Sequence, residues 1–255
     1  MRRLIPCILL LAGLVCAQAT ASAASTGSAT IRRRRVVIVR KGELARKFPE
    51  RRRAVISYPL VSGVADRAAL KKIRALLDVK NVFDTSVAEY GEDAWLTEFG
   101  YKVNYNSNDI LDITFRQEGV GAYPDSQERH FAVSLKTGDV IKAADAFEPA
   151  SLPRLAEMAN ARLRAEVAET VKAVSEDREM DDEGKSSAKE SLEALTFTAE
   201  NLDDFMVTDK GVTFLYDAGF PHVIKALEPD GRYFFSYEQL APYVRRGGPL
   251  GIFVK

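Results

Sequence analysis

The chain has 255 residues, of which 46% are hydrophobic, and its formal net charge is zero, so it can bury the core of one large domain or of two small ones. Its two cysteines exclude a disulfide-rich scaffold. Its two histidines are far apart and neither has a second histidine at i+3 or i+4, which disfavours a zinc hydrolase, and no Gly-x-Ser-x-Gly motif marks a serine hydrolase.

Residues 1–23 predict a signal peptide. Arg2 and Arg3 form a positive n-region, Leu4–Cys16 is apolar, and small residues with an Ala-Ser-Ala cleavage motif at 21–23 follow. The apolar run is shorter than the ~18 residues of a spanning helix, which favours a cleaved Sec signal over an uncleaved anchor. We therefore expect a periplasmic or secreted protein. Both cysteines lie in the removed segment, so the mature protein is expected to hold no thiol, disulfide or cysteine metal site.

Residues 24–53 are predicted to be a basic N-terminal extension. From Arg32 to Arg53 there are eleven basic and two acidic residues, a net charge of +9, which leaves −11 for the rest of the mature chain. Such an arm can dock on an anionic surface, such as membrane headgroups or phosphate-rich envelope polymers. The commoner meaning of a charge run is a solvated extension, here with Val36–Val39 as a first edge strand. Nucleic acid is not the expected partner of an exported chain in which only Phe48 interleaves the arginines.

Residues 54–255 predict a single α+β domain with a mostly antiparallel sheet and helices packed on one face. Alternating apolar residues between turn signals predict the strands, and apolar residues at i, i+3 and i+7 predict a helix over Asp66–Val79. The expected strands of the first part are Ala54–Gly63 (broken at Pro59), Glu98–Asn106, Ile110–Gln117 and His130–Leu135.

A helical insertion is expected at about residues 151–195. Ser151 caps a long helix with one apolar stripe, and a second helix is expected from about Ser187 to Leu195. The acidic run between them matches the oxygen positions of a calcium loop from Glu179 to Glu190. Glu at the first position and Ser186 at the eighth argue against calcium, and we expect a solvated connector and no metal or cofactor.

The C-terminal unit from Phe205 to Phe253 organises the rest of the domain. It is expected to contain a hairpin with an Asp-Lys-Gly turn at 209–211, a long irregular connection, a strand at Tyr233–Phe235 and a helix at Tyr237–Val244. Acidic residues near strand ends (Asp109, Asp112, Asp125 and Asp217) can meet in a cleft, as glycoside hydrolysis requires. Turn and strand-end carboxylates are the simpler interpretation of these residues.

Two blocks of sequence resemble a known family. Gly119–Phe147 contains a Gly-Ala-Tyr-Pro segment, a strand and a Thr-Gly turn, and Gly211–Val244 contains an aromatic strand, an aromatic-Asp turn, a Gly and a closing Ser-Tyr-x-x-Leu helix. Together they resemble the exported domain of lysozyme-binding anti-sigma factors, which also lies N-terminal to some peptidoglycan deacetylases. Many stand-alone members are domains of unknown function. The resemblance implies a small envelope binding domain.

The sequence thus predicts a non-enzymatic binding protein whose partner is a muramidase-like enzyme or a cell-wall fragment. Two alternatives stay open, namely a peptidoglycan-directed hydrolase that uses acidic residues and a structural envelope factor tethered by its basic arm. Aromatic residues among polar groups often anchor interfaces, although strand-end packing also explains each one. The expected binding residues are Tyr123, Asp125, Tyr216, Asp217, Phe220 and His222.

Overall fold

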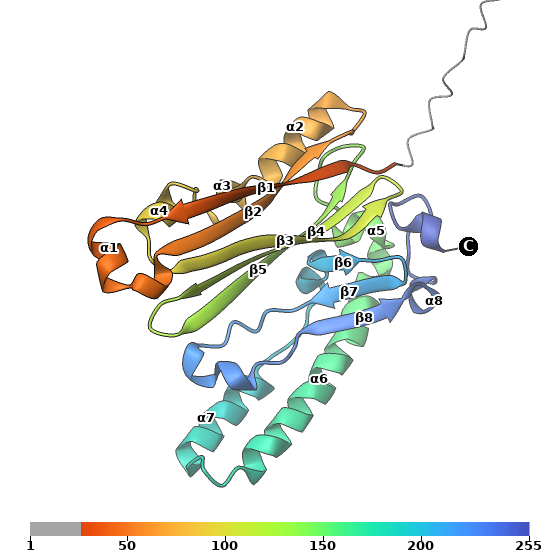
Figure 1. The fold of residues 1–255 in the computed structure, drawn as a ribbon. Coiled ribbons are helices and arrows are strands. Elements are labelled where there is room, and N and C mark those ends of the chain that lie inside the picture. Colours follow the sequence, from red (N-terminus) through yellow and green to blue (C-terminus); the bar gives the residue numbers. More distant parts are fainter. Residues whose placement is uncertain (1–26, 255) are drawn as a thin grey trace, which may run out of the picture.

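The structure is a computed structural model that describes residues 27–254, so the predicted signal peptide lies outside the described residues. The described strands form a five-stranded sheet in the order β1-β2-β3-β4-β5 and a three-stranded sheet in the order β6-β7-β8 (Figure 1). Within residues 27–254, only β2 and β3 pair in parallel. The predicted α+β class with a mostly antiparallel sheet is therefore confirmed, and the strands divide between two sheets.

The first half of the fold is the five-stranded sheet with short helices on one face. Its strands are β1 (Thr30–Val39), β2 (Arg53–Ser62), β3 (Leu96–Ser107), β4 (Ile110–Val120) and β5 (Pro124–Ser134). Parallel β2 and β3 need a crossover connection, which runs through α2 (Arg67–Leu76), α3 (Val79–Phe83) and α4 (Glu89–Glu92). Phe99 and Phe115 from the sheet are fully buried in one core with Ile73 of α2.

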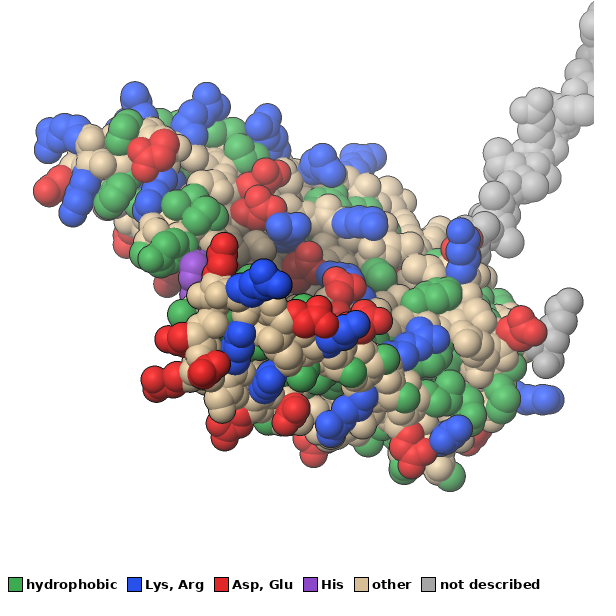
Figure 2. Space-filling view, turned by 90° about the horizontal axis from the view of Figure 1, so that it is seen from below, with side chains coloured by type: hydrophobic (Ala, Val, Ile, Leu, Met, Phe, Trp, Pro, Cys, Tyr) green, Lys and Arg blue, Asp and Glu red, His purple; other side chains and the backbone are tan. Residues whose placement is uncertain are grey.

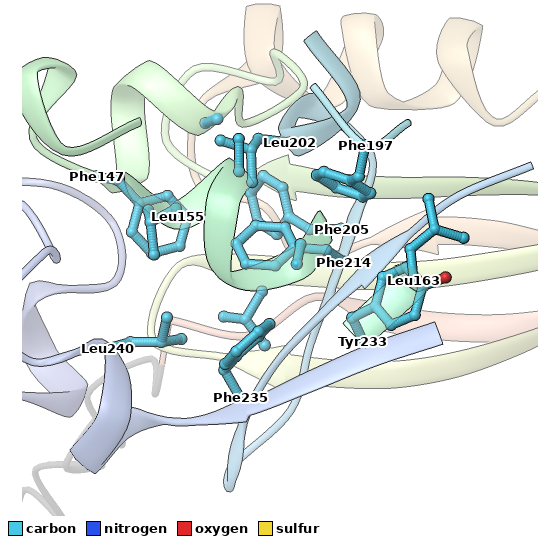
Figure 3. Close-up of a cluster of buried hydrophobic side chains, with 14 of the residues drawn as sticks. Phe147, Leu155, Leu163, Phe197, Leu202, Phe205, Phe214, Tyr233, Phe235 and Leu240 are labelled. Carbon is cyan, nitrogen blue, oxygen red and sulfur yellow. The ribbon is translucent and has the colours of Figure 1, made fainter. Parts of the chain in front are cut away.

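The second half packs the three-stranded sheet against a long helix. It contains α5 (Ala143–Ala146), α6 (Leu152–Glu176), α7 (Asp182–Glu193), β6 (Phe205–Val207), β7 (Gly211–Leu215), β8 (Arg232–Ser236) and α8 (Tyr237–Leu240). Figure 3 shows Leu155 and Leu163 of α6 in one cluster with the aromatic rings of Phe205 and Phe214. The apolar stripe predicted for this helix is thus its core face. No helix among the described residues is both long and apolar enough to span a bilayer.

The basic segment belongs to the fold, contrary to the expected domain boundary at residue 54. β1 pairs with β2 along its whole length, from Thr30 opposite Ser62 to Val39 opposite Arg53, so the domain begins near Thr30. Arg40 is only 3% exposed, and its guanidinium donates to the carbonyls of Tyr90 and Leu96 at 3.0 and 2.9 Å. α1 (Gly42–Lys47) and a 3₁₀ turn at Pro49–Arg51 then lead into β2.

Three other details differ from the sequence-based expectations. Pro59 does not break its strand, because beyond Ile56 β2 pairs only with β1 and needs no donor on the other side. β5 begins six residues before His130, since the β4–β5 hairpin is paired up to Pro124. α7 begins at Asp182, because the Asp181 side chain accepts from the Gly184 amide at 2.8 Å and caps the helix. A twelve-residue calcium loop is therefore not formed.

Candidate functional site

A cleft lies between the open face of the five-stranded sheet and the three-stranded sheet (Figure 2). One part, of about 420 Å³, lies over β3 and β4, and a second part, of about 530 Å³, lies between β5 and the β7–β8 connection. Thr114, Glu128 and Arg232 line both parts, so the two are continuous. The cleft exists because α6 and the short strands form a separate layer beside β5.

The six residues predicted from sequence gather at one end of this cleft. Asp125, Tyr216, Asp217 and Phe220 line its second part. Tyr123 from the β4–β5 hairpin stacks on His222 from the β7–β8 connection, with ring centroids 4.3 Å apart. Tyr123 is 61% exposed, so its ring is the accessible aromatic surface at the mouth of the cleft.

Three of these six residues also have plain structural roles. Asp125 accepts from the amide of Ser126 within β5, and Asp217 accepts from the amide of Gly219 and so stabilises a turn. Phe220 is 9% exposed and packs in the second core, which leaves little of its ring for a ligand.

The four acidic residues considered for glycoside hydrolysis do not share one site. Asp109 forms an ion pair with Lys136 at 3.1 Å and lines a different cavity at the other end of β4. Asp112 is fully buried, so it cannot contact a sugar from solvent. Only Asp125 and Asp217 line the same cleft.

The sequence analysis missed a buried polar cluster beneath the cleft. Asp112 accepts from Asn104 Nδ2 at 2.9 Å, from His130 Nε2 at 3.1 Å and from the backbone amide of Val207 at 2.7 Å. His130 Nδ1 lies 2.9 Å from the hydroxyl of Thr114, its cross-strand neighbour. The signal in the sequence was the pair of polar residues at 112 and 114, which share one face of an apolar strand.

The connectivity of this cluster resembles that of a nucleophile, a base and an orienting carboxylate. With the proton on Nε2, His130 donates to Asp112 and Nδ1 accepts from Thr114. The side chain of His130 is 4% exposed, and every oxygen of Asp112 is satisfied inside the protein. The Val207 amide belongs to β6, so the cluster joins the two sheets and fixes the floor of the cleft.

The second part of the cleft is predominantly acidic. Its lining holds six carboxylates against Arg129, Lys225, Arg232 and His130, and the carboxylates are Asp125, Glu128, Asp204, Asp217, Glu228 and Asp230. Arg232 is paired with Glu128, and Lys225 with Glu228, both at 2.5 Å. Desolvation raises the pKa of Asp204 although part of its side chain reaches solvent. The remaining carboxylates have no ion-pair partner within residues 27–254.

Comparison with solved structures identifies proteins of similar fold. No family model and no curated protein matches the chain. A DUF3298 family protein from Pseudomonas aeruginosa PAO1 is similar with a TM-score of 0.51 and 12% identity, over 85% of this chain and 94% of the other. A member of the DUF3298 family from Bacteroides fragilis NCTC 9343 is similar with a TM-score of 0.51 and 13% identity, over 87% of this chain and 94% of the other.

The chain has the fold of these DUF3298 structures. They are domains of unknown function, as part of the family resemblance implied. At this identity the likeness shows the fold alone, and it does not extend to the narrower family of lysozyme-binding anti-sigma ectodomains.

Proposed function

We propose that the protein is a non-enzymatic envelope binding protein whose cleft takes a basic segment of a muramidase-like partner. The observation that supports this proposal is the excess of carboxylates in the second part of the cleft, next to the exposed ring of Tyr123. Complementary fields of this kind speed association with a basic protein and select against acidic ones. The periplasmic or secreted location on which the proposal depends rests on the signal peptide prediction.

The geometry favours binding over the hydrolase alternative. Asp112 and His130 are enclosed, and they are held by hydrogen bonds that join the sheets. Asp125 and Asp217 reach the cleft, but each also accepts a hydrogen bond from a backbone amide one or two residues further along the chain. The residues that could act in hydrolysis are therefore already engaged in hydrogen bonds within the protein. The exposed aromatic ring and the unpaired carboxylates, in contrast, are available to a partner protein.

The test is calorimetry of the exported protein against several muramidases, with a turbidity assay on purified cell walls. We expect binding that weakens as salt rises, because screening shortens the reach of surface charges to about 8 Å at physiological salt. We also expect slower clearing of walls by the muramidase. Asp125→Asn combined with Asp217→Asn should weaken binding, and Tyr123→Ala should cost about 2 kcal/mol if its ring is an anchor.

The matched control is Glu193→Gln combined with Glu200→Gln, which changes the net charge equally at two exposed positions outside the cleft lining. Equal loss in the control would show that net charge, and not the cleft, drives binding. Absence of binding to every muramidase, with binding to soluble wall fragments instead, would replace the protein partner by a glycan. Clearing of walls by the protein alone would favour the hydrolase.

A further inference from the structure

The free edge of the five-stranded sheet is a strand of arginines. Among the described strands, β1 pairs only with β2, and its Arg32, Arg33, Arg34 and Arg35 are all exposed. Figure 2 shows Lys and Arg side chains projecting along the upper margin of the molecule. This edge is opposite β5, so it is distinct from the acidic part of the cleft.

The two faces of β1 differ in their surroundings. Val36 and Ile38 pack against the first core. Successive side chains of a strand point to opposite faces, so Arg35, Val37 and Val39 lie on the other face. Val37 is 38% exposed and Val39 47% exposed. One face of the strand therefore presents Arg35 and two valines to solvent over a length of about 13 Å.

The cations of this segment are not neutralised by neighbouring carboxylates. Within residues 27–254, the only ion pair of the basic segment joins Arg51 to Glu50 at 3.4 Å. Elsewhere in the same residues Lys72, Lys136, Lys142 and Arg232 each hold a carboxylate. Arg33 and Arg34 instead lie over the rings of Tyr101 and Tyr58, 5.6 and 5.9 Å from their centroids, which leaves their charge available to an outside anion.

Protection of a sheet edge from pairing with other chains accounts for only part of this pattern. Natural proteins place charged residues on edge strands for that purpose. Such protection does not need the further basic residues Arg46, Lys47, Arg52 and Arg53, which are exposed next to β1. It also gives no reason for exposed valines, because apolar side chains on an edge strand promote association.

We propose that this face of β1 binds the surface of a bilayer that contains anionic phospholipid. Lys and Arg near such a surface are attracted to its negative potential, and apolar side chains between them enter the boundary between headgroups and acyl chains. Arg35, together with Arg33 on the exposed edge, would contact phosphate groups, while Val37 and Val39 would enter that boundary. A soluble polyanion would use the arginines and not the valines.

The experiment is sedimentation of the full chain with phosphatidylcholine vesicles, with and without phosphatidylglycerol. We expect binding that needs phosphatidylglycerol and falls as salt rises. Arg33→Ser combined with Arg35→Ser should weaken binding about 30-fold, since each arginine near an anionic surface contributes about five-fold. All variants keep the same residues 1–26, so their differences report the strand alone.

The control is Arg67→Ser combined with Lys71→Ser, which removes two exposed charges from α2 and should leave binding within about two-fold of the parent. Val37→Thr combined with Val39→Thr keeps the β-branched shape and all charges, and it should weaken vesicle binding but not binding to inorganic polyphosphate. Circular dichroism confirms that each variant is folded.

Equal binding to neutral vesicles, or an equal loss in the control, would overturn the proposal. A valine variant that binds vesicles normally would assign the arginines to a soluble polyanion instead. Muramidase binding should be unchanged in all these variants, so the two proposals can fail independently.

Discussion

Replacing Asp112 by alanine should destabilise the fold more than any other single change in the cleft. Three donors use this carboxylate, namely Asn104 Nδ2, His130 Nε2 and the Val207 amide, at 2.9, 3.1 and 2.7 Å. A buried donor left without an acceptor costs about 1–3 kcal/mol. The Val207 amide and the His130 side chain are buried and together cost about 2–6 kcal/mol, a large part of the whole stability of a typical domain, about 5–15 kcal/mol. Asn104 lines the cleft, so water can replace its lost acceptor.

Asp112→Asn is the milder variant that keeps the size of the side chain. Its single carbonyl oxygen can accept from the Val207 amide. Its amide nitrogen then faces Asn104 Nδ2, which is also a donor, at the place where the carboxylate accepted a hydrogen bond. One unsatisfied contact predicts a loss of about 1–3 kcal/mol in the free energy of unfolding. Thr114→Val is the control, since it removes a hydroxyl of the same cluster at a half-buried position where water can take its place, and it should cost about 1 kcal/mol.

Urea denaturation followed by circular dichroism and by the fluorescence of Trp95 measures these losses. Trp95 packs against the first core, so its fluorescence reports the five-stranded half. The Val207 amide belongs to the other half, and weakening this joint should separate the two transitions, which coincide in the parent. An Asp112→Asn protein within about 0.5 kcal/mol of the parent, with coincident transitions, would refute the idea that this carboxylate joins the sheets.

Three further outcomes are expected. In urea denaturation, Gly219→Ala should lower the free energy of unfolding by about 1 kcal/mol, and Gly231→Ala should lower it by at least about 2 kcal/mol more. Both glycines have a φ of +65°, but only a Cβ at 231 would overlap the Tyr216 carbonyl oxygen. Equal losses would contradict this reasoning. The folded state raises the pKa of Asp204 and so binds its proton more tightly than the unfolded chain, which means that the ionised form destabilises the fold. Asp204→Asn should therefore raise the Tm at neutral pH. The gain in Tm should shrink as the pH falls through the folded-state pKa of Asp204 and vanish below the usual pKa of an aspartate. A gain in Tm that persists in acid would exclude this cause. Deleting Thr30–Val39 should abolish cooperative unfolding, since it uncovers β2 along its length, and a truncated protein with a sharp urea transition would show that β1 is dispensable.

Much of the architecture follows from local sequence patterns. The apolar stripe that begins near Leu155 is sufficient to predict α6, because helical periodicity over 25 residues has few alternatives. Alternation and turn residues likewise predicted β3, β4 and β7. The loops with Tyr123 and His222 were chosen for their aromatic and polar composition, and the structure stacks these two rings at the mouth of one cleft.

Other features depend on partners that are distant in sequence. The arginines of β1 are typical of a solvated arm, and only pairing with β2 and burial of Arg40 against the carbonyls of Tyr90 and Leu96 make the segment part of the domain. The role of Asp112 was likewise undetermined, because two of its donors, His130 and the Val207 amide, are 18 and 95 residues away. Sequence patterns report the preferences of neighbouring residues, such as the alternation that predicted β4. A hydrogen bond between two sheets depends on how the whole chain packs, so the tertiary structure alone determined which polar residues form the floor of the cleft.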